Sequence, residues 1–346
     1  MRKTLLIVAA FLICCLAYSQ EGDNGSYGEL SVIPRLYLNP GYSFSEHSFD
    51  SEDAAEFFTQ SSLYTLFEGN ISDNISFSVC NHWLSVQPSI ADLYRYTLRS
   101  DALNWLDWGY FSFSFGHFYF EAGKSAMKIA TSEIEANDYE SYWSMNSILW
   151  NCTQVYQWGG FAGWQTLDGK TVAGAQFTTS PGAARPFTGS YAFAIYGSHE
   201  FDNGYVKASF NNYDTGYWGD YEMVSKKVFM GAVSGYYDFD VLDLTLDGYV
   251  SNVYNGVSLM AGKEILEDQL TVYAKAGIER LRPADINGFY GGVVAEWYPF
   301  RESRYFSDLK FHALASYNGS RQAGEVYDSA IRCSVGALYN FTFSLF

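Results

Sequence analysis

The sequence predicts an all-β protein, namely a closed antiparallel transmembrane β-barrel of about 16 strands, with 14 to 18 strands possible. The first observation is that apolar and polar residues alternate from about residue 28 onward, in runs of about 9 to 14 residues. The second is that Gly, Asp and Asn separate these runs, while aromatic residues gather near their ends. The third is that no stretch after the N-terminus is apolar for the roughly 20 residues that a membrane-spanning helix needs. If the chain crosses a bilayer, it crosses as strands.

The first 19 residues have the pattern of a secretory signal peptide. Arg2 and Lys3 provide the positive start, an apolar stretch follows, and a small-x-small cleavage site ends at Ser19. We therefore expect an exported chain in which residues 1–19 are removed and residues 20–346 form one outer-membrane β-barrel. Cleavage removes two of the 21 bases and none of the 38 acids, so the mature chain carries a net charge of −19.

The alternation gives each predicted strand one apolar face and one polar face. In one run, Leu244 and Leu246 are separated by Thr245 and flanked by Asp243 and Asp247. The predicted strands lie near 28–38, 59–68, 74–86, 106–115, 117–126, 153–166, 170–178, 188–200, 204–211, 225–238, 241–250, 256–265, 269–280, 288–299, 308–317 and 327–343. Their even number is typical of bacterial single-chain barrels.

The lengths of the connectors give a second, independent indication. Connectors after even-numbered strands are mostly tight, such as Gly116 with His117 and Phe239 with Asp240. Connectors after odd-numbered strands are mostly longer, and they include 39–58, 87–105, 127–152, 179–187 and 212–224. This asymmetry is typical of short periplasmic turns and long extracellular loops, and it puts both termini on the short-turn side.

A water-soluble sandwich of two sheets is the structural alternative, because it also hides one face of every strand. Aromatic residues at strand ends, as in Trp105 with Trp108 and Trp297 with Tyr298, favour the barrel instead, since aromatic girdles mark both membrane interfaces. Closure follows from hydrogen bonding, because in hydrocarbon each unpaired backbone group at an open sheet edge costs several kcal/mol.

The net charge of the chain excludes strongly anionic partners. The 38 acidic and 21 basic residues give a net charge of −17, which repels nucleic acid and anionic membrane surfaces. The chain has five histidines but neither a Gly-x-Ser-x-Gly nor a His-Glu-x-x-His motif. We therefore expect no catalytic or metal residues, no cofactor and no nucleic-acid partner.

In a barrel, the polar face of each strand lines the lumen and determines what passes. Strand parity assigns five basic and five acidic residues to this face, so the wall is predicted to be balanced in charge. These ten residues are Arg35, Lys207, Lys275, Lys310 and Arg332 on the basic side, and Glu121, Asp243, Asp247, Glu279 and Glu296 on the acidic side. For any one position, plain solvation of a charged side chain is the simpler interpretation.

The longest predicted loop, 127–152, is acidic. Its charged residues are Lys128, Glu133, Glu135, Asp138 and Glu140, which give a net charge of −3. The loop either folds back into the lumen as a constriction or lies on the cell surface, and the sequence leaves both open. Inside the lumen, its carboxylates would favour cations over anions.

Two short stretches resemble the phosphate-selective porin O and P family. Phe118–Lys124, with the sequence FYFEAGK, precedes the long loop, and Ala175–Pro181, with the sequence AQFTTSP, follows it. The likeness covers about residues 105–200, and beyond them it rests on strand rhythm. The resemblance implies a 16-stranded outer-membrane porin, commonly trimeric, that passes small polar solutes. The family's phosphate selectivity is not expected in this chain, because a ladder of lumen Lys and Arg is replaced by a balanced wall and an acidic loop.

Together these observations predict a porin in the outer membrane of a Gram-negative bacterium, without strong phosphate preference, through which small hydrophilic solutes or ions diffuse passively. The expected partners are outer-membrane lipid and these solutes, and a homotrimer is one possible assembly. Two alternatives stay open. The chain could be a non-conducting surface barrel that serves as an adhesin or scaffold, or a barrel lipid hydrolase with Ser and His on adjacent strands.

Overall fold

The structure is a computed structural model. It describes residues 26–44, 47–49, 61–85, 106–136, 138–181, 190–218, 223–283, 285–322 and 325–345, so the predicted signal peptide lies outside it. The described strands are β1 (Tyr27–Leu38), β2 (Gly41–Ser43), β3 (Ser48–Phe49), β4 (Ser62–Ser72), β5 (Ile75–Ser85), β6 (Leu106–Phe115), β7 (Phe118–Ala126), β8 (Tyr156–Gln165), β9 (Thr171–Thr179), β10 (Tyr191–Phe201), β11 (Gly204–Trp218), β12 (Met223–Phe239), β13 (Leu242–Ser251), β14 (Tyr254–Leu266), β15 (Leu270–Leu281), β16 (Ile286–Trp297), β17 (Lys310–Gln322), β18 (Glu325–Leu338) and β19 (Phe341–Ser344). The described helical segments are α3 (Ser132–Glu135), η2 (Asp138–Glu140), η3 (Trp143–Met145) and α4 (Ile148–Cys152). Within the described ranges, no helix is long and apolar enough to cross a membrane.

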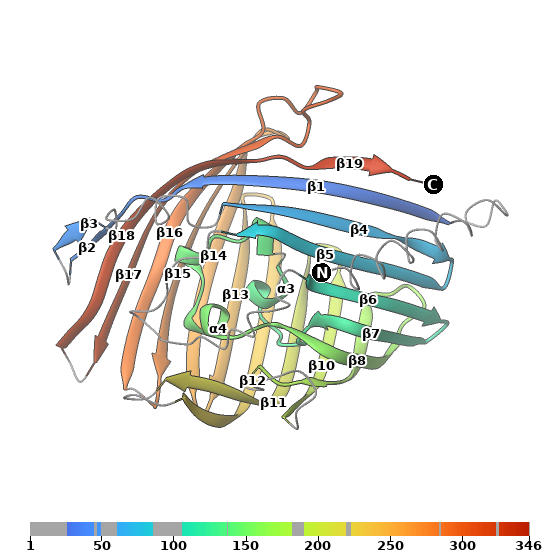
Figure 1. Cartoon of the computed structure of the whole chain (residues 1–346), viewed down its shortest axis with the longest axis horizontal. Helices are drawn as coiled ribbons and strands as arrows, with labels where there is room; N and C mark the ends of the chain where they lie inside the picture. The colour runs from blue at the N-terminus through green and yellow to red at the C-terminus, as the bar shows by residue number, and fades with distance from the viewer. Residues whose placement is uncertain are drawn as a thin grey trace.

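The strands close into one antiparallel barrel of 16 strands (Figure 1). From β4 to β18, each strand pairs with the next along the chain. β1 closes the ring, because it pairs with β4 on one side and with β18 and β19 on the other. β2 continues the line of β1 along β18, β3 pairs with β2, and β19 continues the line of β18. These short segments extend barrel strands and add none to the count.

The predicted fold class is confirmed, and each of the 16 predicted runs overlaps one barrel strand. The predicted long loop 212–224 is wrong. β11 extends to Trp218 and β12 begins at Met223, because the cross-strand pairing continues from Tyr213↔Val228 to Trp218↔Met223. The Asn, Asp and Gly residues in this stretch are typical of a loop, but backbone hydrogen bonding between β11 and β12 keeps them in strands. The long-loop asymmetry therefore weakens in the second half of the barrel, where β13 and β14 are joined by residues 252–253.

The outer surface of the barrel is apolar. On β13, Leu246 and Val250 are 53% and 65% exposed, whereas Asp247 and Tyr249 are 4% exposed. Exposed aromatic residues form one belt at the short-turn ends (Phe115, Phe118, Phe239 and Trp297) and one at the opposite ends (Phe177, Tyr191, Phe229 and Tyr317). An apolar band between two aromatic girdles matches the profile of a lipid bilayer.

Two glycines let large rings lie flat against the inner wall. A Cβ atom on Gly256 would fall 2.4 Å from the Tyr249 hydroxyl oxygen, and one on Gly277 would fall 2.3 Å from the Tyr290 ring. Both glycines stand on strands next to the tyrosine they accommodate. Keeping these rings close to the wall leaves room inside the barrel for a segment of the chain that enters the lumen.

Candidate functional site

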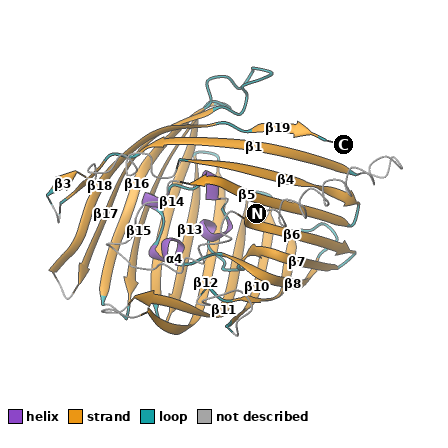
Figure 2. Ribbon diagram, in the orientation of Figure 1, coloured by secondary structure: helices purple, strands orange, loops and turns teal. Residues whose placement is uncertain are grey.

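The segment between β7 and β8, residues 127–155, lies inside the barrel and is called the inner loop. It carries the four described helical segments, which sit within the ring of strands (Figure 2). Residues from distant parts of the wall contact it, including Arg35 of β1 and Asp247 of β13. Of the two positions that the sequence allows for this loop, the structure shows the one within the lumen.

Apolar packing holds the inner loop against the wall on several sides. One cluster joins loop residues to the strands from β10 to β16, and its loop members are Met127, Ile129, Ile134, Ile148 and Leu149. Tyr139 joins a second cluster with β1, β4, β5 and β6, and Met145 joins a third with Val294 and Leu314. Burying a side chain such as Leu149, which is 1% exposed, contributes about 1.5–3 kcal/mol.

Polar side chains of the wall bind the backbone of the inner loop. Asp247 Oδ1 accepts the Ser132 N–H at 2.9 Å, and Asp247 also accepts the Ser132 hydroxyl. Glu279 Oε2 accepts the Ile148 N–H at 2.6 Å. A buried N–H without a partner costs about 1–3 kcal/mol, so these contacts are needed wherever the loop backbone leaves water. Two predicted lumen acids therefore anchor the loop.

One ion pair between the loop and the wall is almost fully buried. Lys275 of β15 contacts Glu133 of α3 at 2.5 Å, and the two side chains are 8% and 5% exposed. Glu133 also accepts the Ser147 N–H at 3.1 Å and the Ser147 hydroxyl at 2.5 Å. Ser147 is the N-cap of α4. Glu133 therefore ties α3, α4 and the wall together.

Two further pairs balance charge between the loop and the wall. Lys207 of β11 pairs with Glu135 of the loop, and Lys128 of the loop contacts Glu121 of β7 at 3.1 Å. Lys207 also lies 4.1 Å from the centroid of the Tyr205 ring. Much of the acidic charge that the sequence assigns to this loop is therefore matched by a base.

A basic group of wall residues meets the loop on the opposite side. Arg35 Nη2 donates to the Ser141 carbonyl at 2.5 Å. The Tyr142 hydroxyl and the Lys310 ammonium both donate to Glu296 Oε1, at 2.7 and 2.8 Å. Burial raises the pKa of the Tyr142 hydroxyl well above its usual range, so the hydroxyl stays protonated and donates.

The remaining predicted residues lie in different places. Arg332 of β18 lies 4.9 Å from the centroid of the Trp143 ring. Asp243 and Glu140 line a cavity between the loop and the wall. The side chain of Asp138 lies outside what the structure describes. Apart from Asp138, each predicted lumen or loop residue thus contacts the opposing surface, pairs beside it or lines the space between the two.

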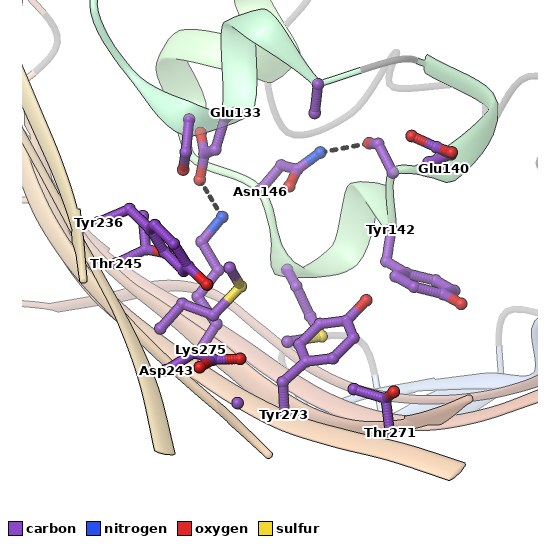
Figure 3. A pocket seen from close by; sticks show the side chains of 16 residues that line it. Glu133, Glu140, Tyr142, Asn146, Tyr236, Asp243, Thr245, Thr271, Tyr273 and Lys275 are labelled. Atoms are coloured by element: carbon purple, nitrogen blue, oxygen red, sulfur yellow. Dashed lines mark hydrogen bonds and ion pairs between the residues drawn. The ribbon is translucent and has the colours of Figure 1, made fainter. Parts of the chain in front are cut away.

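This cavity, of about 320 Å³, lies between the inner loop and strands β12 to β15 (Figure 3). Its lining includes the rings of Tyr142, Tyr236 and Tyr273 and the carboxylates of Glu133, Glu140 and Asp243. Lys275 reaches across it to Glu133. Asp243 stands near the start of β13, beside the turn at 240–241, so this part of the lining lies toward the short-turn side.

Sequence reasoning missed the neutral anchors of the loop. Gln176 of β9 accepts the Lys128 N–H at 2.8 Å and donates to the Ala126 carbonyl at 2.9 Å, so it bonds the loop backbone as a neighbouring strand would. Asn211 donates to the Lys128 carbonyl at 2.9 Å, and Ser209 accepts the Ala130 N–H at 3.0 Å. Parity points such residues inward, but nothing in the sequence separates an anchor from a solvated amide.

A second missed feature is an apolar inner face. On β12, Val228 and Met230 are fully buried inside the barrel, and Phe229 between them is 48% exposed outside. A strand that is apolar on both faces predicts a cover for the inner one, and this signal could have placed the loop in the lumen. Among the described residues, no group of three or more His, Cys, Asp or Glu side chains could hold a metal ion.

Comparisons with known proteins support the fold. No family model and no curated protein matches the chain. Among solved structures, the outer membrane channel DcaP of Acinetobacter baumannii is similar with a TM-score of 0.58 and 10% identity, over 91% of this chain and 96% of that one. The fold is that of an outer-membrane porin.

Two further solved structures resemble the chain in the same way. The trimer form of in-vitro folded OmpT, an outer membrane protein of Vibrio cholerae, gives a TM-score of 0.57 at 11% identity, covering 91% of this chain and 99% of that one. A mutant of the Rh. blastica porin gives 0.50 at 13% identity, covering 91% and 99%. Identities this low establish the fold alone. The narrower resemblance to the phosphate-selective porin O and P family stays a prediction.

Proposed function

We propose that this chain is a channel in the outer membrane of a Gram-negative bacterium, through which small hydrophilic solutes or ions diffuse passively. The observation that carries the proposal is the contrast between an apolar exterior and an interior lined by side chains such as Asp247, Lys275 and Glu296. In hydrocarbon such charges are costly, so a closed barrel keeps them on its inner side, away from lipid. The inner loop then narrows the passage. Diffusion needs no chemical step, and the proposal gives no residue a catalytic role.

We also propose that the channel has no strong preference for phosphate. Lys207, Lys275 and Lys310 of the wall each contact a carboxylate, and this pairing leaves them poorly placed to form a ladder of anion sites. The acidic side chains at the cavity, Asp243 and Glu140, favour cations instead.

The proposed assembly is a barrel surrounded by outer-membrane lipid, with a homotrimer as the candidate oligomer. The apolar surface and the two aromatic belts support the lipid contact. The trimer form of the similar OmpT supports the oligomer. Removal of residues 1–19 as a signal peptide belongs to the same proposal, since an outer-membrane barrel must be exported.

Conductance in a planar bilayer tests the proposal. We expect stepwise current increases when the folded protein is added in potassium chloride, and a reversal potential in a salt gradient that shows cation preference. Replacing chloride by phosphate should leave the cation preference in place. A clear preference for phosphate would contradict the proposed selectivity, and a silent bilayer with correctly folded protein would contradict the channel.

The second candidate is a non-conducting barrel that acts as an adhesin or scaffold. It is favoured by one observation, namely that apolar clusters join the inner loop to strands on both sides of the barrel. If this packing filled the whole cross-section, no continuous water path would remain. The same conductance experiment separates the two candidates, because only the channel gives discrete openings.

A further inference from the structure

The cavity under the inner loop has more aromatic surface than passive diffusion requires. Tyr142 and Tyr273 lie with their ring centroids 6.3 Å apart and their planes tilted by 48°. Tyr236 contributes a third ring from β12, and its centroid lies 5.5 Å from that of Tyr205 in a stacked arrangement. Figure 3 shows Tyr236 and Tyr273 on the wall side and Tyr142 on the loop side of one space. The faces of aromatic rings carry negative electrostatic potential and attract cations.

The charged side chains of the cavity lining also favour a cation. Three carboxylates and one ammonium group line the cavity, and the ammonium group of Lys275 already pairs with Glu133. Asp243 adds a carboxylate to this lining from the wall side. On the strand next to Asp243, Asp238 stands directly opposite it and adds a further acid. Lys263, whose charge also acts on Asp243, donates to the Asp240 carbonyl at 2.7 Å.

We propose that this cavity is a binding site for a small organic cation, a quaternary ammonium, alkylammonium or guanidinium group, on its path through the barrel. The inference rests on the proposed channel and names the class of solute that the channel holds longest. The wall rings of Tyr236 and Tyr273 provide aromatic surface for the apolar rim of such a cation, and Asp243 provides the opposing charge. A cavity of about 320 Å³ falls at the small end of ligand pockets.

Anions and uncharged solutes fit this lining less well. A phosphate or carboxylate would face the Asp243 carboxylate, and Lys275 of the lining is already held by Glu133. An uncharged polar solute gains hydrogen bonds in the cavity but neither the Coulomb attraction nor the attraction of the ring faces. The difference between a cation and its uncharged isostere is therefore the specific signature of the site.

The test uses choline and its uncharged isostere, in which a carbon replaces the quaternary nitrogen. Binding of each to the folded full-length protein in detergent micelles is measured by calorimetry, and block of potassium current is measured in the bilayer. We expect choline to bind at least about tenfold more tightly than the isostere, which corresponds to about 1.4 kcal/mol. Choline should also reduce the current.

Variants locate the effect in the cavity. Asp243→Asn should weaken choline binding about threefold to tenfold, because one of the opposing charges is lost. Tyr236→Leu should also weaken it, whereas Tyr236→Phe should retain it, because the ring face and not the hydroxyl makes the contact. Unchanged gel mobility of the heat-treated and untreated barrel shows that each variant is folded.

The outcomes separate this inference from the proposed function. Equal binding of choline and its isostere to wild-type protein overturns the inference, whether or not the channel conducts. Unchanged choline affinity in folded Asp243→Asn overturns it as well. Choline binding in micelles together with a silent bilayer supports the site but contradicts the channel. Normal potassium current without choline binding supports the channel but contradicts the binding site.

Discussion

The inner loop meets the barrel wall in two different ways on its two sides. Toward β9 to β15, Asp247 and Glu279 accept N–H groups of the loop, and Lys207 and Lys275 pair with loop acids, beside a large apolar cluster. Toward β16 to β18 and β1, the wall presents bases, and these meet a loop carbonyl at Ser141 and the aromatic ring of Trp143. The first surface therefore holds the loop by buried ion pairs, backbone hydrogen bonds and apolar packing. The second holds it by Arg35, Arg332 and the acceptor Glu296.

On both sides, most charged side chains of the lumen wall hold the inner loop in place. A balanced wall of five bases and five acids suggests ten charges facing water, but most of them bind the loop or pair beside it. At the cavity, Asp243 stands where its charge can act on a solute. Substitutions on each side should therefore change stability first, and selectivity mainly at the cavity.

The largest effect is expected from breaking the buried ion pair on the β9 to β15 side. Lys275→Met leaves Glu133 buried without its partner, which should lower the free energy of unfolding by about 3–5 kcal/mol. Urea denaturation followed by gel mobility measures this. The double variant Lys275→Met with Glu133→Gln should recover much of the loss, because no buried charge is left unpaired. Equal losses in the single and double variants would show that the pair does not hold the loop.

The apolar cluster on the same side should give the next largest effect. Leu149→Ala removes a side chain that is 1% exposed, and such a change costs about 2–5 kcal/mol. The looser loop should also make single-channel current noisier. Leu246→Ala is the matched control, because Leu246 is 53% exposed on the outer face and contacts lipid. If both variants lost the same stability, the loop would not be packed in the lumen.

The close contact between Gly277 and the Tyr290 ring on the inner wall gives a third test. Gly277→Ala places a methyl group 2.3 Å from the Tyr290 ring, so the ring must move toward Glu133 and the loop. We expect a loss of about 1–3 kcal/mol from overpacking. Gly231→Ala is the control, since no atom lies within 4 Å of a Cβ atom at that position. Thermal denaturation of the two variants in the same detergent should separate them clearly.

On the basic side, a smaller effect is expected from one hydrogen bond. Tyr142→Phe removes the donor to Glu296, which keeps its contact with Lys310. Because Glu296 stays paired, the loss should be about 1 kcal/mol. Burial keeps the folded Tyr142 hydroxyl protonated, whereas an unfolded tyrosine ionises near its ordinary pKa of about 10. The advantage of wild type over the variant should therefore be constant below about pH 9 and shrink as the pH rises above about 10. A difference that stayed constant well above about pH 10 would contradict the buried position of this residue.

The smallest effect should come from a turn pair outside the lumen. Lys170 contacts Asp202 at 2.9 Å, but their side chains are 47% and 90% exposed. Water screens such a pair, so Asp202→Asn should leave the denaturation midpoint unchanged within error. A loss comparable to that of Lys275→Met would mean that burial does not set the order of these effects.

The barrel could be predicted from the sequence because its two faces obey one simple rule. Lipid outside and water inside select a period of two, and this period gives both the strands and the inward direction of residues such as Asp247 and Lys275. Strand ends were harder, as the stretch 212–224 shows. The turn-forming residues in that stretch are part of β11 and β12, because the backbones of the two strands pair there. Composition does not reveal such pairing.

The interior could be predicted only in part, because it depends on contacts between distant segments. Parity directs Glu279 inward, but it cannot show that Ile148 donates to it from 131 residues away. Gln176 and Asn211 were missed for the same reason. The apolar inner face at Val228 and Met230 breaks the polar rule of a water-filled lumen, and it is the one local signal that a loop covers this wall.

The position of the inner loop can be measured directly by crosslinking Ser132 to Asp247. The native cysteines are replaced by serine, both positions are changed to cysteine, and the folded protein is treated with dibromobimane, which fluoresces when it bridges two nearby thiols. The structure predicts strong fluorescence and an internal crosslink between the two peptides in the protease digest. Neither single-cysteine variant should show these signals. Absence of the crosslink in the folded double variant would contradict the central claim that this segment lies inside the barrel, against the wall at Asp247.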